Sequence, residues 1–374
     1  MTLPLVGFYV HYHGLGHKHR TEAILQHLTL PATVLTSRIH DLSWQGPTLQ
    51  EVIGLDCDID DVPEEGLSRA QDVSALHYAP LWTNGCTRRI AQFADWVDRR
   101  RPALMVVDVS AEISLLTRLC SVPQLVMRQH GIRTDPAHTA AYEAAEALLA
   151  PFPEIMEDDQ TPDWIRERTI YLDGFARSSS AVSRSDARQQ LKIESDRQIV
   201  VAMFGRGGDG VPLHHLIDAA RQCEHYEWYA IGQTADCNCA LPSNLHIVGW
   251  TDQPQLWLSV ADCVVTAAGH NSVMEVGRQR RPFIAIAEDR PFQEQHRKAA
   301  VLDRQGLAIG LHNWPDGEVW PTLLRRAERL DVSRWDAIYQ QDGAAQAADC
   351  IRHFATDSDE VRRATGARKD ISHA

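Results

Sequence analysis

The sequence lacks the features that identify several large classes of protein. Of its 374 residues, 37 are Lys or Arg and 50 are Asp or Glu, which gives a formal net charge of −13. A nucleic-acid-binding protein normally presents a basic surface, so no nucleic-acid partner is expected. No apolar run is long enough to cross a bilayer. The first residues contain no basic segment followed by a long apolar stretch, so we expect no signal peptide and a cytoplasmic location.

Paired cysteines are also lacking. The eight cysteines are scattered, and only Cys237 and Cys239 lie close together in the sequence. A structural zinc site needs a second pair of ligands at a suitable spacing, and none follows these two residues. Reduced thiols with structural roles are therefore expected, in agreement with a cytoplasmic protein.

The sequence does contain a repeated alternation of short apolar runs and longer helical patterns, over a length that suits two domains. The runs typical of buried strands cover residues 4–10, 32–35, 103–109, 124–127, 198–204, 226–231, 245–248, 263–266 and 283–286. Continuous apolar strands separated by helices predict parallel sheets that are covered on both faces. We therefore predict an α/β protein with two doubly wound, Rossmann-like domains that face a cleft.

The boundaries between these domains follow from composition. The segment 174–185 is rich in Ser and Ala and is typical of a linker. We place the first domain at 1–175 and the second at 176–345. Residues 346–374 are predicted to form a C-terminal helix, with a frayed tail, that packs back on the first domain. Because open α/β sheets bind ligands outside the carboxyl ends of their strands, we expect the site in the cleft.

The most informative stretch is 262–302, where a predicted strand ends at Ala267-Ala268-Gly269 and a helix begins near His270-Asn271-Ser272. Unpaired backbone N–H groups and the positive end of the helix dipole favour a diphosphate site at such a point. Glu275 follows one helical turn later, where its carboxylate could bind both ribose hydroxyls of a nucleotide. The alternative is a helix N-cap at Asn271 or Ser272, with Glu275 as its capping-box partner.

This stretch resembles the donor-binding signature of glycosyltransferases with the GT-B fold, as in the plant-type UDP-sugar transferases. The matching positions are Gly269, Asn271, Ser272, Glu275 and Gln295, with Glu294 in the place of the acidic residue of the signature. The sequence departs from the signature at Ala267 for a phosphate-binding His, at His270 for Trp and at Lys298 for the final Asn. The resemblance implies that the matching residues, with His270, bind a nucleotide-sugar, most simply a UDP-sugar.

Most of the chain is similar to a closer family, the bacterial UDP-N-acetylglucosamine transferases of lipid II synthesis. Gly14-Leu15-Gly16-His17 resembles the N-terminal glycine-rich loop of this family, and Gly205-Arg206-Gly207-Gly208 resembles its second loop. Arg177 resembles its linker arginine, which meets the diphosphate, and Trp250 lies in the turn whose backbone reads the base. The first domain is thereby implied to bind the acceptor and the second domain the donor.

The acceptor side is less completely matched. Of the polar core of the family's acceptor segment, only Gln129 and Gly131 are retained. Gly14, Gly16 and Gln129 are the acceptor-side residues implied by the resemblance, and His130 with Arg128 are further candidates. The acceptor is expected to offer a hydroxyl group. A lipid-linked acceptor would bring the protein into peripheral contact with the inner face of the membrane.

His17 is the candidate catalytic base. An inverting transferase must deprotonate the attacking hydroxyl, and an imidazole at the end of the first strand suits that task near neutral pH. The alternative is a contact that binds acceptor phosphate or orders the backbone. Asp108 ends a buried strand at the cleft, where it could orient His17 or bind the acceptor, and a helix N-cap is equally compatible with it.

Two absences bear on the reaction itself. Many retaining GT-B enzymes carry a Glu eight residues before the ribose-binding Glu, and that position is Ala267 here, which favours inversion. Asp58-Ile59-Asp60 matches the letters of a metal-binding Asp-x-Asp motif, but it lies in an acidic loop of the first half. We therefore expect no obligatory metal and no cofactor, with the leaving diphosphate stabilised by backbone N–H groups and the helix dipole.

Two other functions remain open at this stage, and a third is disfavoured by the sequence. A nucleotide-sugar hydrolase of sialic-acid-like sugar pathways would carry the pattern Gly14, Gly16, His17 and Arg20, and would use His17 to activate water. A non-catalytic nucleotide-sugar-binding protein would keep the donor site alone. An NAD-dependent oxidoreductase needs an acidic residue after its second strand, and Thr36-Ser37-Arg38 offers none.

Overall fold

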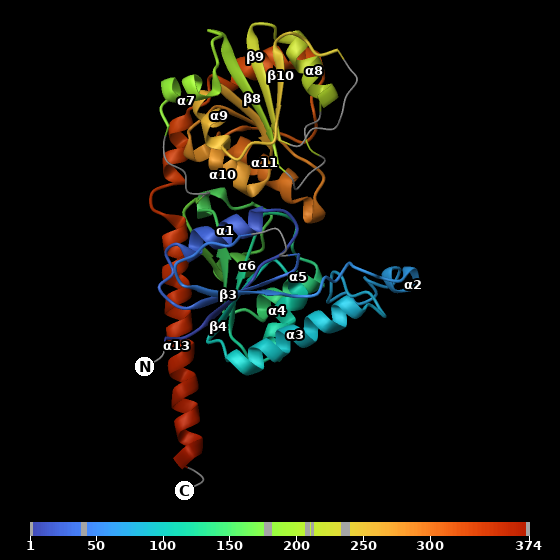
Figure 1. Cartoon of the computed structure of the whole chain (residues 1–374), viewed down its shortest axis with the longest axis vertical. Coiled ribbons are helices and arrows are strands. Elements are labelled where there is room, and N and C mark those ends of the chain that lie inside the picture. Colours follow the sequence, from blue (N-terminus) through green and yellow to red (C-terminus); the bar gives the residue numbers. More distant parts are fainter. Residues whose placement is uncertain are drawn as a thin grey trace.

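A computed structural model shows two α/β units, one above the other in Figure 1. It describes residues 3–38, 43–175, 182–205, 210, 213–232 and 240–371. The first unit has a seven-stranded sheet in the order β3-β2-β1-β4-β5-β6-β7, and the second has a six-stranded sheet in the order β10-β9-β8-β11-β12-β13. Every strand pair in both sheets is parallel. The predicted fold class, with two doubly wound domains, is confirmed.

The first sheet is built from short apolar strands. Its strands are β1 Val6–Tyr9, β2 Ala32–Thr36, β3 Leu49–Gly54, β4 Leu104–Asp108, β5 Gln124–Met127, β6 Ala147–Ala150 and β7 Thr169–Tyr171. Its helices are α1 Gly16–Leu25, α2 Glu64–Leu67, α3 Asn84–Arg100, α4 Ala111–Leu119, α5 Pro136–Glu143 and α6 Asp163–Glu167, with a 3₁₀ turn at Glu154–Met156. Every residue of β1, β2, β4, β5 and β6 is buried, because helices cover both faces of the sheet.

The second sheet repeats this plan. Its strands are β8 Gln198–Phe204, β9 Tyr226–Gly232, β10 Leu245–Gly249, β11 Cys263–Ala267, β12 Phe283–Ile286 and β13 Ile309–Leu311. Its helices are α7 Arg184–Leu191, α8 Leu213–Gln222, α9 Pro254–Val260, α10 His270–Arg278, α11 Glu294–Arg304 and α12 Trp320–Ala327. The 3₁₀ helices are η2 Pro291–Gln293, η3 Gly317–Val319 and η4 Val332–Ala337.

The strand order places the two ligand-binding edges. The order in which strands are added to the sheet reverses between neighbours β1 and β4 in the first sheet, and between β8 and β11 in the second. Loops that leave such neighbouring strands on opposite sides open a crevice at the carboxyl edge of the sheet. The segments that follow these four strands begin at Val10, Val109, Gly205 and Ala268.

The C-terminal helix α13, Gly343–Ile371, lies along the first unit (Figure 1). Ala344, Ala347, Ile351 and Ala355 lie in one apolar cluster with residues of β1, β2 and α1. The small alanine side chains allow this helix to pack closely on the first unit. The helix begins at Gly343, three residues before the predicted boundary at 346. Within the described residues, no helix is both long enough and apolar enough to cross a membrane.

The chain therefore passes twice between the units, and the two passages are hydrogen-bonded to each other. The Gly174 N–H donates to the Ile338 carbonyl at 2.7 Å. The Asp173 N–H donates to Gln346 Oε1 at 2.7 Å, and the Asp173 carboxylate accepts from the Gln341 N–H. These contacts fix the first passage against the start of α13.

Helix α10 packs closely against η4 at Gly277, which has no side chain. A Cβ atom on Gly277 would lie 2.2 Å from the ring of Trp335, so only glycine leaves room for the indole at this distance. Trp335 is fully buried and its Nε1–H donates to the Leu307 carbonyl at 3.0 Å. The contact between Gly277 and Trp335 fixes the C-terminal half of α10 against η4.

We predict that Gly277→Ala destabilises the protein by about 1–3 kcal/mol, because overpacking against Trp335 outweighs the better helix propensity of alanine. Urea unfolding followed by tryptophan fluorescence measures this change. Gly317→Ala is the control, since its Cβ would make only van der Waals contacts at 3.4 Å or more. Equal midpoints for the two variants would contradict the prediction.

Candidate active site

A cavity of about 840 Å³ lies between the two units, at the carboxyl edges of both sheets. Predicted site residues that line it are Gly14, Gly16, His17, Gln129, Gly205, Trp250, Gly269, His270, Asn271, Ser272, Glu275, Glu294 and Gln295. Asp108 and His130 are not among the lining residues. Arg177, Arg206, Gly207 and Gly208 lie outside the described residues. The structure thus brings most of the predicted donor and acceptor residues to one cavity.

The N-terminus of α10 opens into this cavity. Its N-cap is Gly269, and no side chain caps the helix. Asn271 instead donates its Nδ2–H to the Gly16 carbonyl, at 3.2 Å. The capping-box alternative is therefore wrong. The first backbone N–H groups of the helix have no partner within the helix and favour an anion, while Glu275 lines the cavity one turn later.

A second helix N-terminus lies opposite. Helix α1 has Leu15 at its N-cap, again with no side-chain cap. Gly14 has φ of 76°, a conformation that glycine adopts without strain, and it turns the chain from β1 into α1. The hydrogen bond from Asn271 to Gly16 joins the starts of the two helices across the gap. Both helix dipoles therefore make the electrostatic potential at the cavity more positive.

His17 belongs to a buried polar triad in the first unit. Its Nδ1 lies 3.0 Å from Asp108 Oδ2. Arg20 Nη2 lies 2.6 and 2.7 Å from the two Asp108 oxygens and 3.0 Å from His17 Nδ1. Helix α1 places His17 and Arg20 one turn apart, and the end of β4 supplies Asp108. His17 Nδ1 thus faces an acceptor, Asp108, and a group that can only donate, Arg20. When the Nδ1 proton is donated to Asp108, Nε2 is the basic nitrogen of His17.

The charge state of this triad follows from its environment. Asp108 is 2 % exposed and Arg20 is 4 % exposed. Burial alone would raise the pKa of Asp108, but the Arg20 guanidinium, followed by His17, lowers that pKa below its usual value. The neighbouring His11 ring is 5.6 Å from His17. Burial, aided by His17, lowers the pKa of His11 to about 4, so His11 is neutral near pH 7.

The two units meet around Glu294, on the α11 side of the cavity. Glu294 lies 3.6 Å from Arg133 and 3.8 Å from Lys298. Gln129, with its amide oriented to suit its neighbours, donates to Glu294 Oε2 at 2.9 Å and accepts from Arg20 Nη1 at 3.1 Å. Glu294 is thus engaged by cations and an amide from both units.

Gln295 is held by a carboxylate that sequence reasoning missed. The Gln295 Oε1 accepts from the Glu288 N–H at 3.0 Å, and its Nε2 donates to Glu288 Oε2 at 3.1 Å. Glu288 also pairs with Arg290 at 3.0 Å, and it lines the cavity. Its place two residues after β12, at a carboxyl edge, is the signal that could have identified it.

Trp250 follows β10 at the rim of the second unit. Its side chain is 45 % exposed, and its Nε1–H donates to Asp252 Oδ1 at 3.2 Å. Gly249 before it has φ of 79°, which directs the turn toward the cavity. Trp250 and Thr251 of this turn line the cavity.

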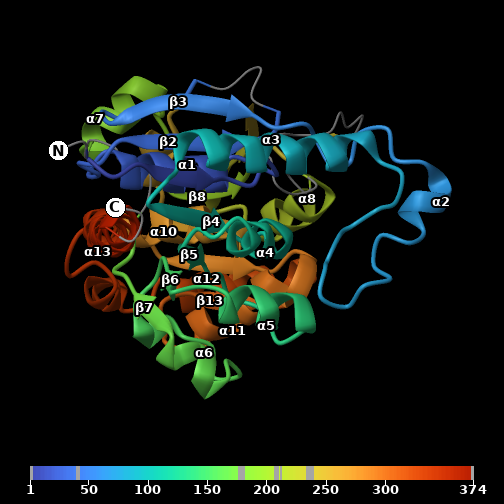
Figure 2. The same ribbon diagram turned by 90° about the horizontal axis from the view of Figure 1, so that it is seen from below.

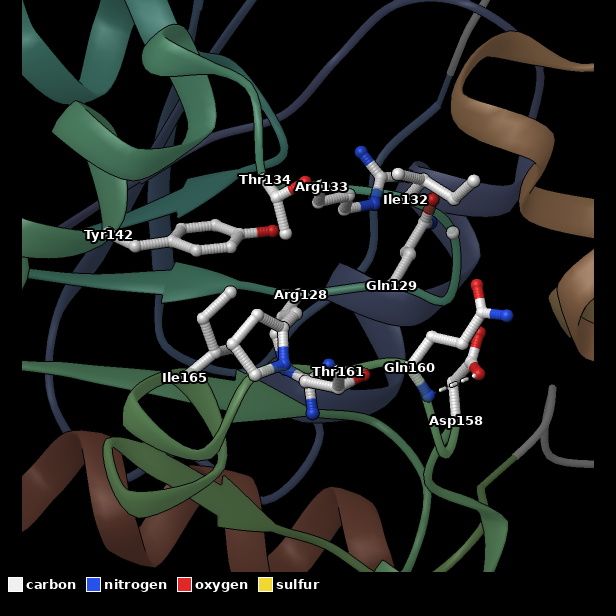
Figure 3. A pocket seen from close by; sticks show the side chains of 12 residues that line it. Arg128, Gln129, Ile132, Arg133, Thr134, Tyr142, Asp158, Gln160, Thr161 and Ile165 are labelled. Atoms are coloured by element: carbon white, nitrogen blue, oxygen red, sulfur yellow. Dashed lines mark hydrogen bonds between the residues drawn. The ribbon is translucent and has the colours of Figure 1, made fainter.

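The β5–α5 segment, 128–134, separates the main cavity from a smaller one of about 210 Å³ (Figure 3). Gln129 and Arg133 line both cavities. His130 lies between these two residues in the sequence and is 1 % exposed. Its ring is 4.0 Å from that of Phe152, and its Nε2 is 2.7 Å from the Met156 carbonyl. The His130 side chain thus packs inside the first unit instead of facing the main cavity.

Phe292 of η2 contacts the first unit next to this segment. Its backbone adopts φ of 60°, and its carbonyl accepts from the Ile132 N–H at 2.7 Å. Its ring lies 4.9 Å from that of His77 and 4.5 Å from that of His138. The Arg133 guanidinium lies 5.2 Å from the same ring. This contact aligns the second unit with the wall of the cavity.

One group of side chains in the described part of the chain has the composition of a metal site, namely His77, Asp135 and His138. Asp135 bridges the two rings, at 2.8 Å from His77 Nε2 and 2.6 Å from His138 Nδ1. Arg133 Nη1 lies 2.8 Å from His138 Nε2 and must donate to it. A metal on Nδ1 would require a proton on Nε2, facing that donor, so these residues fit a hydrogen-bonded bridge better than a metal site.

Residues 77 and 78 line the cavity and belong to the long segment between β3 and α3 of the first unit. Figure 2 shows the segment that carries α2 extending away from the sheet, beyond α3. Glu112 Oε1 accepts from the N–H groups of His77 at 2.6 Å and Tyr78 at 3.0 Å. Tyr12 donates its hydroxyl to Asp58 at 2.9 Å on the same wall. The predicted acceptor side is therefore rich in rings and carboxylates.

We predict that Asp108→Asn destabilises the protein by about 3–5 kcal/mol, because it leaves the Arg20 guanidinium buried without a countercharge. Chemical denaturation measures the loss. The control is Asp60→Asn, whose exposed pair with Arg38 contributes little. An Asp108→Asn variant as stable as this control would show that the buried pair does not matter for folding.

Comparisons with known proteins agree with this architecture. No protein-family model matches the chain, and neither does the sequence of any curated protein. Among solved structures, the glycotransferase of kitacinnamycin matches with a TM-score of 0.69 at 13% identity, covering 95% of this chain and 100% of the other. MurG of Acinetobacter baumannii matches with a TM-score of 0.61 at 15% identity, covering 93% and 99%.

A plant protein matches equally well over its length. UGT89C1 of Arabidopsis thaliana, in complex with UDP, gives a TM-score of 0.66 at 13% identity and covers 94% of this chain and 99% of its own. At such identities the comparisons establish the fold. The chain has the two-domain GT-B fold of these glycosyltransferases, and the resemblance predicted from its motifs is confirmed at this level.

Proposed function

We propose that this protein is a glycosyltransferase that moves a sugar from a nucleotide-sugar, a UDP-sugar, to a hydroxyl of an acceptor, with inversion and without a metal ion. The observation that carries the proposal is the uncapped N-terminus of α10 in the interdomain cavity, with Glu275 one turn along the same wall. His17 lines the same cavity from the other unit. The groups proposed to bind the donor and the proposed base therefore line the same cavity.

The donor would bind to the second unit. Its diphosphate would accept hydrogen bonds from the backbone N–H groups at the start of α10, where the helix dipole favours negative charge. Glu275 would accept from both ribose hydroxyls, and the turn at Trp250 would read the base. The shared fold with a UDP complex of UGT89C1 supports UDP as the nucleotide.

The first unit would supply the base. His17 Nε2 takes the proton of the acceptor hydroxyl while the acceptor oxygen bonds to the anomeric carbon, and the bond from that carbon to the diphosphate oxygen breaks. Asp108 orients the ring and stabilises the imidazolium that forms. Attack from the face opposite the leaving diphosphate inverts the anomeric centre. Ala267, where retaining enzymes carry a carboxylate, supports this course.

The acceptor would be a small molecule with a flat, hydroxyl-bearing ring system. The first-unit wall of the cavity presents the rings of His11, Tyr12, His13, His77 and Tyr78. The arginines on that wall, Arg20 and Arg133, are already paired with carboxylates, so they do not favour an anionic lipid diphosphate. UGT89C1 has also been solved with quercetin, which agrees with such an acceptor.

The reaction is tested by incubating the purified protein with UDP-sugars, with and without a panel of phenolic acceptors, and following products by mass spectrometry. Sugar conjugates that form only with an acceptor support transfer. Rapid release of free sugar without an acceptor would instead identify a nucleotide-sugar hydrolase. Binding of UDP with no turnover under either condition would identify a sugar-nucleotide-binding protein.

We predict that Glu275→Ala weakens UDP binding by about 10- to 100-fold, because two hydrogen bonds from hydroxyls to a carboxylate are lost. Titration calorimetry measures the dissociation constant. Glu318→Ala, on the distant turn η3, is the matched carboxylate control and should leave it unchanged. An unaltered UDP affinity for Glu275→Ala would remove this residue from the donor site.

We predict that His17→Ala lowers the turnover number by about 10²- to 10⁴-fold, the usual contribution of a general base. UDP affinity should stay within about twofold, because His17 lies on the acceptor side. Steady-state kinetics and calorimetry on the same preparation separate the two effects. Turnover equal to that of the unmodified protein would exclude His17 as the base.

A further inference from the structure

Lys298 is a buried cation that the proposed reaction does not yet use. It lies on α11, is fully buried, and its Nζ makes no hydrogen bond to the described residues. Glu294, one turn before it, offers a carboxylate oxygen at 3.8 Å, too far for a hydrogen bond. A buried ammonium without such bonds is costly, and a methionine of similar shape would fill the same space at a lower cost.

Among the described residues, Lys298 has no carboxylate of its own. The neighbouring buried cations each have one within ion-pair distance: Arg20 pairs with Asp108, Arg128 with Glu157, and Arg133 with Glu294. Lys298 only shares Glu294 with Arg133, at 3.8 Å. Burial lowers the pKa of His130 to about 3 and holds that of His270 well below its usual value, so neither of these rings adds a positive charge. The ammonium of Lys298 is therefore the least compensated charge of this group.

Lys298 lies near the start of α10. Glu294 and Gln295, which precede Lys298 by one turn on α11, both line the main cavity, and helical side chains lean toward the N-terminus of their helix. The Nε2 atom of Gln295 lies 3.9 Å from the Cβ position of Gly269, the N-cap of α10. His270, the first residue of α10, also lines the cavity, and its Nε2 is buried without a partner among the described residues. After burial, the charge of Lys298 is the largest influence that lowers the pKa of His270, and it acts in the same way on the pKa of His130 of the first unit. Lys298 is therefore close both to the start of α10 and to the first unit.

We propose that Lys298 is the buried countercharge of the donor diphosphate: it acts through space, behind His270, on the anion held at the N-terminus of α10. This inference rests on the proposed donor site. Among the described residues no carboxylate forms a hydrogen bond with Lys298, and a diphosphate bound in the cavity would add negative charge close to it. Lys298 then discriminates nucleoside diphosphates from nucleosides, while the base and ribose contacts treat both alike.

The test compares UDP with uridine in the full-length protein and in Lys298→Met. We expect UDP affinity in the variant to fall on the order of tenfold, because the field of one charge in a poorly solvated site is lost, and uridine affinity to stay within about twofold. Lys192→Met, an exposed lysine of the same unit, is the control and should change neither. Calorimetry measures all six dissociation constants.

A second measurement needs no variant. Burial lowers the pKa of Lys298 to about 8, against the opposing effect of Glu294 and with help from Arg20 and Arg133. Near pH 8.5 part of the Lys298 population is neutral. A diphosphate nearby raises the pKa of Lys298, so UDP binding at pH 8.5 should take up a larger fraction of a proton than uridine binding, since the uracil N3–H contributes alike for both ligands.

Calorimetry in buffers with different ionisation enthalpies measures this proton uptake. A fractional uptake with UDP that disappears in Lys298→Met supports the inference. Equal weakening of UDP and uridine binding would overturn it in favour of a packing role, and unchanged UDP affinity would overturn it outright. Should Lys298→Met fail to fold, Lys298→Gln and proton uptake by the unmodified protein decide the question. Failure of the unmodified protein to bind either ligand would instead refute the donor site itself.

Discussion

The arrangement of this protein depends on one constraint, that two parallel sheets face each other by their carboxyl edges. Each sheet directs the loops of its switch point, and the start of a helix, toward the same gap. The Asn271–Gly16 hydrogen bond joins the two helix starts directly. Because neither helix is capped by a side chain, the gap keeps unpaired N–H groups that only a ligand or water can satisfy. The positive potential of the site is therefore a property of the fold before any single residue is considered.

The fold and the location of the site could be predicted from the sequence, because they depend on local patterns. Apolar runs such as 263–266 and the Gly269–Glu275 stretch identify a strand, a turn and a helix without reference to the rest of the chain. Long-range pairing could not be predicted in the same way. Arg20 and Asp108 are separated by 88 positions, and no periodicity connects them.

The same limit explains the residues that sequence reasoning placed less well. Gln295 lines the cavity, where it was expected, but sequence reasoning did not identify the partner of its amide, Glu288. His130 was expected on the acceptor side, but the β5–α5 turn directs it into the core beside Phe152. In both cases a side chain could be assigned to the right loop, and its direction depended on packing partners far away in the sequence. In the sequence Lys298 is only a departure from the final Asn of the signature, and its complete burial is visible only in the structure.

The double passage of the chain between the units has a mechanical consequence. Residues 173–174 and the start of α13 are hydrogen-bonded side by side, so the two halves are joined by a strap of two strands of chain and not by a single swivel. Two hydrogen-bonded segments resist twisting of one unit against the other better than a single linker would, so they help to keep the two helix starts facing each other across the gap.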